Sequence, residues 1–303
     1  MPIASMPISK IAAAVFTLSL PAAMSIPALG QTLEGTIDMH AHSDPDGTPR
    51  KIDAIDLAKL AKSRGMRAIV LKNHYEPTAS LAYIVRKEVP GIEVFGGVTM
   101  DLTNGGVNPA AVEWMSKVKG GYGKVVWMPT YDAEYQVTQS KQDRPFARVS
   151  KDGKLTPEVV QVIGIVAKNN MVLETGHISP AEVLMVLGEG KRQGVRNMLV
   201  THATSQYPGL SIEQLKQATQ LGAYLEFVWS GARGAGLAHW IQAIRAVTPQ
   251  WVVISSDLGQ PSNPLHPDGL LELYRTLKAQ GFSDAEVAQM SKTNPAKLLG
   301  LAP

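Results

Sequence analysis

The chain has 303 residues, of which 45% are hydrophobic and 18% are charged, and its formal net charge is +3. This composition supplies enough apolar material for one large core and excludes a wholly disordered chain. Lysine and arginine are scattered among acidic residues and form no basic stripe, so we expect no nucleic-acid partner.

Residues 1–30 have the pattern of a signal peptide. They contain one lysine, no acidic residue and an apolar run over residues 11–24, and small residues at 28–30 (ALG) suit a cleavage site. The run is shorter than the roughly 20 apolar residues that a bilayer requires. We therefore expect a mature chain, 31–303, that forms a single domain, is exported to the periplasm or secreted, and has no stable membrane insertion after cleavage.

Short apolar or β-branched runs alternate with amphipathic stretches along the mature chain. The runs that we interpret as strands are 35–42, 67–74, 92–100, 123–130, 171–177, 196–202, 223–229 and 251–257. Strands that alternate with helices predict a parallel α/β fold. Eight such units in about 270 residues favour a closed (β/α)₈ TIM barrel, for which ~250 residues is usual. A doubly wound open sheet is the alternative.

Capping residues mark several of the predicted helix starts. Thr156, Ser179 and Ser211 each offer a hydroxyl before a helical stretch, and Asn294-Pro295 opens the last helix in a similar way. The longest gap between strands, residues 131–155, is polar and charged. In a barrel this loop lies on the catalytic face, where it forms either part of a substrate wall or a solvated excursion.

Histidines are concentrated at the ends of the predicted strands. Five of the seven end or nearly end a strand, namely His40, His42, His74, His177 and His202. The C-terminal ends of barrel strands converge on one ring, so we expect these side chains to lie close together. His266, in a proline-rich loop, is expected on the surface.

His40 and His42 lie two residues apart on one strand, so both side chains face the same side, as in a chelate. A chance pair of core histidines would give the same pattern. His177, His202 and Asp257 at later strand ends favour a metal site, although Asp257 alone could be a helix N-cap. The chain has no cysteine, and imidazole and carboxylate are ligands that Zn²⁺ accepts.

These motifs resemble the amidohydrolase superfamily of metal-dependent hydrolases. The resemblance covers nearly the whole mature chain and rests on DMHAH (38–42), ETGHIS (174–179), VTHA (200–203), SSDLGQ (255–260) and NPAKLLGL (294–301). The segments LKNHYEPT (71–78) and GGVNP (105–109) suggest a poorly characterised branch of it.

The resemblance implies a role for each matching residue. His40, His42 and Asp257 hold one divalent metal, with Zn²⁺ as the expected ion, and His177 and His202 hold a second ion or complete the first site. Asp257 also acts as the general base. In the mechanism that we expect, the metal or His202 stabilises the developing oxyanion. The number of metal ions, one or two, is left undecided. The fourth strand ends in residues 127–130 (WMPT) and offers no lysine or glutamate to bridge two ions.

Other bridging candidates are few. Lys124 lies too near the start of its strand, and Glu174, an odd number of residues from His177, is expected to face the helices. Lys72 remains, two residues before His74. It is either a carboxylated bridge between two ions or an ammonium that binds an anionic group of the substrate.

Three side chains have structural alternatives to a functional role. The Lys72 ammonium would also pair with Asp38 or Glu76. His74 is a candidate substrate contact, or it only hydrogen-bonds Asp38 or a backbone carbonyl. Arg144, in the long loop, is a candidate contact for an acidic substrate.

The sequence thus predicts an enzyme that hydrolyses an amide, cyclic amide, lactone or ester bond in a small molecule. It contains neither a serine nucleophile elbow nor a cysteine nucleophile. Related barrels use the same residues to decarboxylate aromatic acids, so a lyase is the main alternative. A barrel that binds a metal or ligand without turnover is a third, and a homo-oligomer is not excluded.

Overall fold

A computed structural model describes residues 1–2 and 32–302 of the chain. The predicted leader therefore lies almost entirely outside the described residues. None of the helices within them is both long and apolar enough to span a membrane.

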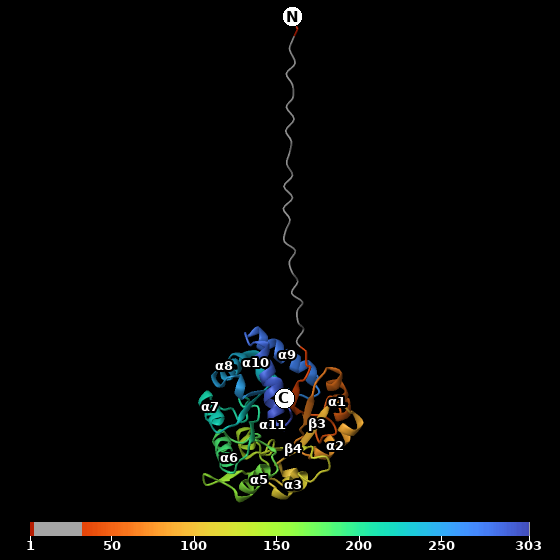
Figure 1. Ribbon diagram of the computed structural model, residues 1–303. Helices are drawn as coiled ribbons and strands as arrows, with labels where there is room; N and C mark the ends of the chain where they lie inside the picture. The colour runs from red at the N-terminus through yellow and green to blue at the C-terminus, as the bar shows by residue number, and fades with distance from the viewer. Residues whose placement is uncertain (3–31, 303) are drawn as a thin grey trace. The chain divides into compact units, whose positions relative to one another are not determined.

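Eight parallel strands form one sheet in the order β1-β2-β3-β4-β7-β8-β9-β10. The strands lie inside a ring of helices (Figure 1). Their bounds are β1 Ile37–Ala41, β2 Ala68–Leu71, β3 Glu93–Thr99, β4 Gly123–Trp127, β7 Val172–Glu174, β8 Asn197–Val200, β9 Tyr224–Val228 and β10 Val252–Ser255. A parallel bridge between Ala41 and Leu258 joins the two edges. The predicted (β/α)₈ barrel is confirmed, and the open sheet is wrong.

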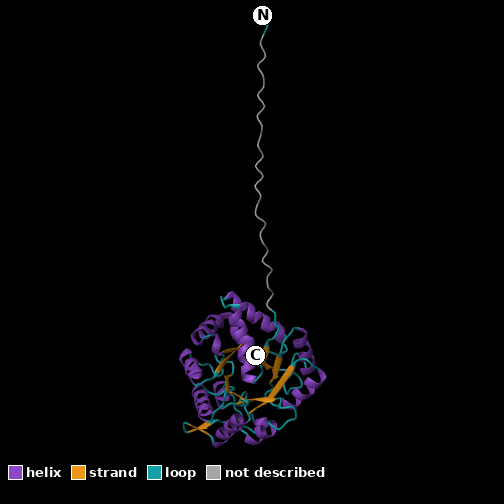
Figure 2. Cartoon of the chain, viewed as in Figure 1, coloured by secondary structure: helices purple, strands orange, loops and turns teal. Residues whose placement is uncertain are grey.

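Helices surround the strands (Figure 2). They are α1 Ala54–Ser63, α2 Ala79–Glu88, α3 Pro109–Met115, α4 Glu134–Gln139, α5 Pro157–Lys168, α6 Pro180–Arg192, α7 Ile212–Gln220, α8 Leu237–Val247, α9 His266–Ala279, α10 Asp284–Ala288 and α11 Asn294–Leu299. Thr156, Ser179 and Ser211 cap α5, α6 and α7 as predicted, the last two in full capping boxes. Asn294 caps nothing, because a π-helical turn leads directly into α11.

The core has two layers. Strand residues that face the helices form one cluster with the apolar helix faces. Residues that face inward, among them Ile37, Trp127 and Tyr224, form a second cluster with Ala296 and Leu298 of α11. Helix α11 therefore covers one end of the barrel interior and leaves the end at which the strands' carboxyl termini meet for a site.

The segment after β4 is more ordered than the predicted loop. It contains α4 and a two-stranded hairpin, β5 Ser150–Lys151 and β6 Lys154–Leu155. Each strand ends one to three residues before the predicted bound, so that His74, His177 and His202 lie in the turns that follow the strands.

Candidate metal centre

Strand β1 places two histidines at the mouth of the barrel. The pairing of β1 with β2 slips by one residue between Asp38 and Ala41, which is the mark of a β-bulge. Asp38 stabilises this irregularity, because its Oδ1 accepts from the backbone N–H of His40 (3.1 Å) and of Ser256 (2.9 Å). Burial raises the pKa of Asp38 to about 6, although these hydrogen bonds oppose the shift.

His40, His42 and Asp257 bring three ligand atoms together. Asp257 Oδ1 lies 3.3 Å from His40 Nε2 and 3.2 Å from His42 Nε2. Two ligands of a tetrahedral ion at about 2.0 to 2.2 Å lie roughly 3.2 to 3.6 Å apart. His40 Nε2 is buried and has no hydrogen-bond partner among the described residues, although Asp257 is near. A buried nitrogen without a hydrogen-bond partner is what we expect of an atom that binds a metal ion.

The protonation preferences of the site also fit a metal. Burial lowers the pKa of His42 well below its usual value, with the Lys72 charge adding to the effect, and burial lowers the pKa of His202 as well. Burial opposes ionisation of Asp257, but the charges of His40 and His202 and the hydrogen bond to His42 hold its pKa well below its usual value. Neutral imidazoles and an ionised carboxylate are the forms that bind metal ions.

His177 and His202 form a second pair beside the first. Their Nε2 atoms lie 3.0 Å apart, and the ring of His202 stacks on that of His40 with centroids 5.9 Å apart. His177 Nδ1 hydrogen-bonds Gln136 Oε1 of α4. The five predicted ligand residues therefore lie together at the carboxyl ends of β1, β7, β8 and β10.

Unusual backbone conformations set the directions of the His177, His202 and Asp257 side chains. Both His202 (φ 25°) and Asp257 (φ 51°) adopt positive φ values, which side chains with a Cβ atom rarely do, and Gly176 before His177 has φ 59°. A Cβ atom on Gly176 would overlap the carbonyl oxygen of Met128. Strained residues of this kind are often found at functional sites.

Two buried glutamates differ from what the sequence predicts. Glu226, which received no role, has its Oε2 3.1 Å from His40 Nδ1. Glu174 does not face the helices as predicted. It points into the barrel, where its Oε2 accepts from Thr201 Oγ1 (3.0 Å), because β7 ends at Glu174 and the turn at Gly176 breaks the parity with His177.

Lys72 is buried within this acidic interior and is 1% exposed. Its Nζ lies 3.5 Å from His74 Nδ1. Burial lowers the pKa of Lys72, and the charges of Asp257 and Glu174, among others, oppose the shift. The predicted partners Asp38 and Glu76 are wrong, because Asp38 is held by β1 and β10, and Glu76 bonds the backbone of Gly47.

The hydrogen-bond partners of the His74 ring among the described residues are Lys72 and Thr130, not Asp38 as predicted. Its Nδ1 lies 2.8 Å from Thr130 Oγ1, and the Thr130 hydroxyl bonds the buried carboxylate of Asp101. The ring of His74 stacks on Tyr131, with centroids 3.7 Å apart and planes inclined by 10°. Tyr75 and His177 lie next to Tyr131, with ring centroids 6.2 and 6.0 Å away. Aromatic rings therefore line the mouth beside the candidate ligands.

The long loop forms part of this wall. Arg144 binds the Asp132 carboxylate and the Tyr131 carbonyl, so its guanidinium holds the loop in place. Tyr207 comes from the loop after β8, and its hydroxyl forms a 2.7 Å hydrogen bond with the Ser140 hydroxyl. The ring centroids of Tyr207 and His177 are 6.4 Å apart. Residues 131–137 are therefore buried or half-buried and are not a solvated excursion, whereas Thr138 and Gln139 are exposed.

His266 is a further correction. It is 1% exposed, and its Nε2 lies 2.9 Å from the carbonyl oxygen of His42. His266 is the first residue of α9, and its ring supports the backbone of a candidate ligand.

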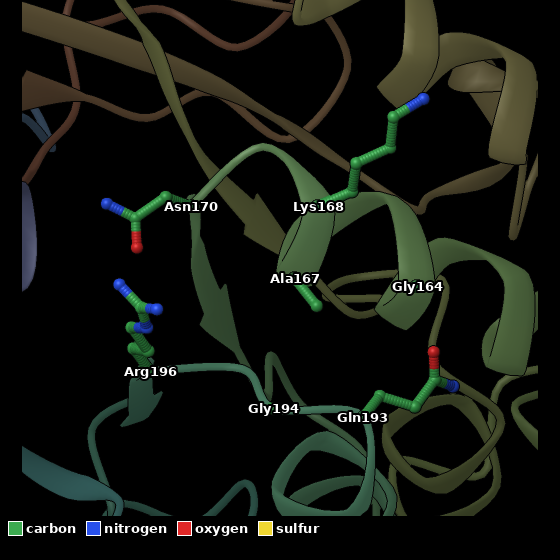
Figure 3. Close-up of a pocket in the computed structure, with 7 residues that line it drawn as sticks. All are labelled: Gly164, Ala167, Lys168, Asn170, Gln193, Gly194 and Arg196. Atoms are coloured by element: carbon green, nitrogen blue, oxygen red, sulfur yellow. The ribbon is translucent and has the colours of Figure 1, made fainter.

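A surface hollow of about 460 Å³ lies away from this centre (Figure 3). Lys168, Asn170, Gln193 and Arg196 contribute side chains to it, and Lys168 points away from Arg196 in Figure 3. These residues precede the amino ends of β7 and β8, whereas His177 and His202 follow the carboxyl ends. The hollow is therefore at the opposite end of the barrel from the histidines.

A family model described as a family of unknown function (DUF6282) matches residues 35–226. That range includes four of the five predicted ligand residues. No curated protein sequence matches the chain.

Solved structures share the fold at low sequence identity. An amidohydrolase from Pseudomonas aeruginosa has a TM-score of 0.63 and 14% identity, over 88% of this chain and 95% of that chain. A phosphotriesterase homology protein from Escherichia coli has a TM-score of 0.58 and 17% identity, over 88% and 99%. The 2,6-dihydroxybenzoate decarboxylase from Rhizobium has a TM-score of 0.58 and 12% identity, over 88% and 99%. The resemblance to the amidohydrolase superfamily is thus confirmed for the fold.

Replacing both His40 and His42 by alanine is expected to abolish metal retention and leave the barrel folded, because the pair supplies two ligands from one strand. Elemental analysis and circular dichroism of the purified variant check this. The matched control is His239→Ala, a change at an exposed histidine of α8. Undiminished metal in the double variant would contradict the site.

Proposed function

We propose a function for this chain, which belongs to the family of unknown function DUF6282: it is a metal-dependent hydrolase of a small molecule. The observation that carries the proposal is the approach of Asp257 Oδ1 to the Nε2 atoms of both His40 and His42, at 3.3 and 3.2 Å. The bond cleaved is an amide, cyclic amide, lactone or ester. The proposal includes export by a leader over residues 1–30.

His40, His42 and Asp257 would hold a divalent ion, and we favour Zn²⁺ because the ligands are imidazole nitrogen and carboxylate oxygen. When bound, the ion would act as a Lewis acid and would lower the pKa of a nearby water toward about 7. His177 and His202 would either bind a second ion or contact the substrate.

Asp257 is proposed as the general base. Its side chain is 21% exposed, so it reaches both the buried histidines and the open mouth of the barrel. The low pKa keeps the carboxylate ionised at neutral pH. It can accept a proton from the attacking water and then donate that proton to the leaving nitrogen or oxygen.

His202 is proposed to stabilise the negative charge that develops on the substrate. A single ion held by His40, His42 and Asp257 would leave the Nε2–H of His202 or its neighbour His177 free to donate a hydrogen bond to an oxyanion. The 3.0 Å separation of the two Nε2 atoms allows one substrate oxygen to approach both.

Lys72 is proposed as an ammonium that binds an anionic group of the substrate. Burial lowers the pKa of Lys72, and the charge of Asp257 is the largest of those that favour the protonated amine. A carboxylated lysine would be negative and would be repelled by the Asp257 carboxylate. The ammonium therefore suits this position better than the bridge.

A substrate panel on the metal-replete protein tests the proposed reaction. Esters, lactones and cyclic amides would be assayed for hydrolysis, and aromatic acids for release of carbon dioxide. We expect hydrolysis that is lost on chelation and restored by Zn²⁺. Carbon dioxide release without hydrolysis would establish the lyase, for which the fold shared with the Rhizobium decarboxylase is the supporting observation. Metal binding without either activity would support the non-catalytic barrel.

Asp257→Asn is expected to lower kcat about 10²- to 10⁴-fold and to keep most of the metal, since the amide retains one oxygen ligand but cannot accept the proton. Steady-state kinetics and metal analysis measure the two effects. Asp268→Asn, the same change at a half-exposed residue of α9, serves as the control. Wild-type turnover in Asp257→Asn would mean that another group is the base.

Lys72→Met is expected to leave the metal stoichiometry unchanged and to lower kcat/KM for an anionic substrate by about 10- to 150-fold, because a charged hydrogen bond contributes about 1.5–3 kcal/mol. Lys124→Met, near the start of β4, is the control. The result that favours a carboxylated bridge is a loss of one metal per chain that a short carboxylate restores.

A further inference from the structure

We infer that Glu226 is a positioning residue for the metal centre: one of its carboxylate oxygens orients His40 and fixes the backbone at His202. This inference rests on the proposed metal site. Glu226 lies on β9, the one strand between β8 and β10, and it is fully buried. It is not itself one of the three residues whose ligand atoms converge.

The first contact sets the tautomer of His40. Glu226 Oε2 lies 3.1 Å from His40 Nδ1, and both side chains are 0% exposed. A carboxylate oxygen only accepts, so Nδ1 must carry the proton and donate it. The lone pair of His40 is then on Nε2, the atom that lies 3.3 Å from Asp257 Oδ1 and has no hydrogen-bond partner among the described residues.

The second contact fixes the chain at His202. The same Oε2 accepts from the backbone N–H of His202 at 3.0 Å, and the backbone carbonyl of Glu226 accepts from the N–H of Ala203 at 2.9 Å. His202 has a positive φ of 25°, which is unfavourable for a residue with a Cβ atom. These two hydrogen bonds hold the strained turn that aims the His202 ring at His177.

One oxygen thus links β1 to the turn after β8. A carboxylate that accepts from the outer nitrogen of a ligand histidine raises the basicity of that ligand and holds its ring plane, and loss of such a partner commonly costs 10- to 100-fold in metal affinity. Glu226 adds a constraint on a second candidate ligand, so its removal should affect both pairs of histidines.

Glu174 provides a matched control. It is the neighbouring buried glutamate, also 0% exposed, and it lies on β7 of the same barrel interior. Its Oε2 accepts from Thr201 Oγ1, and its hydrogen bonds among the described residues include no candidate ligand histidine. Glu226→Gln and Glu174→Gln therefore make the same chemical change at the same depth, and they differ in the contact to His40 and His202.

The test is the Zn²⁺ affinity of the full chain, measured by competition with a chromophoric chelator. We expect Glu226→Gln to weaken Zn²⁺ binding by about 10- to 100-fold, and Glu174→Gln to change it by less than about threefold. Nitrogen-15 NMR of the metal-free wild type should show His40 protonated on Nδ1. Equal affinities in the two variants, or a His40 protonated on Nε2, would overturn the inference.

Two further measurements keep the test decisive. If Glu226→Gln does not fold, Glu226→Asp and Glu174→Asp replace the pair, because aspartate keeps the charge but withdraws the oxygen from His40. The same difference in affinity is expected, and its absence overturns the inference. A wild-type chain that binds no Zn²⁺ would overturn the proposed metal site, and this inference with it. Zn²⁺ binding with no effect at Glu226 would overturn this inference alone.

Discussion

The seam between β1 and β10 is the constraint on which the candidate site depends. The carboxyl end of β1 and the segment after β10 exchange backbone hydrogen bonds, from Asp257 N–H to the His40 carbonyl and from His42 N–H to the Leu258 carbonyl, each at 2.9 Å. These bonds close the barrel and at the same time bring Asp257 to both histidines. Gly259 is part of the seam, because a Cβ atom there would lie 2.7 Å from His42 Cβ. The same two hydrogen bonds thus close the barrel and assemble the site.

Charged side chains are buried beside the candidate ligands. Glu226, Glu174 and Lys72 are almost fully buried. Buried charges are costly unless they are paired, so the presence of Glu226 next to His40 and of Lys72 next to His74 favours a functional reason over a purely structural one. Burial and the charge of Glu226 raise the pKa of Glu174 well above its usual value, whereas contacts with His40 and His202 outweigh burial and lower that of Glu226.

The fold and the positions of the candidate ligands could be predicted from the sequence, because both depend on periodic signals. Alternating strands and helices predict a barrel, and a barrel brings strand ends together. The side-chain directions beyond the strands could not be predicted, since positive φ values at Gly176 and Asp257 break the two-residue period, and this is why Glu174 was misplaced. The role of Glu226 could not be predicted, because the sequence pattern of one acidic residue in an apolar strand is the same whether its side chain contacts a histidine or is exposed to solvent. His266 was misplaced because proline-rich loops are usually exposed.

The central claim is that His40, His42 and Asp257 bind one divalent ion. Anomalous X-ray diffraction from crystals of the purified protein, recorded on both sides of the zinc absorption edge, tests it most directly. The account predicts an anomalous peak within about 2.0 to 2.2 Å of His40 Nε2, His42 Nε2 and an Asp257 oxygen, with any second ion bound by His177 and His202. A zinc-replete crystal with no peak at these residues, or with its only peak elsewhere on the chain, would contradict the account.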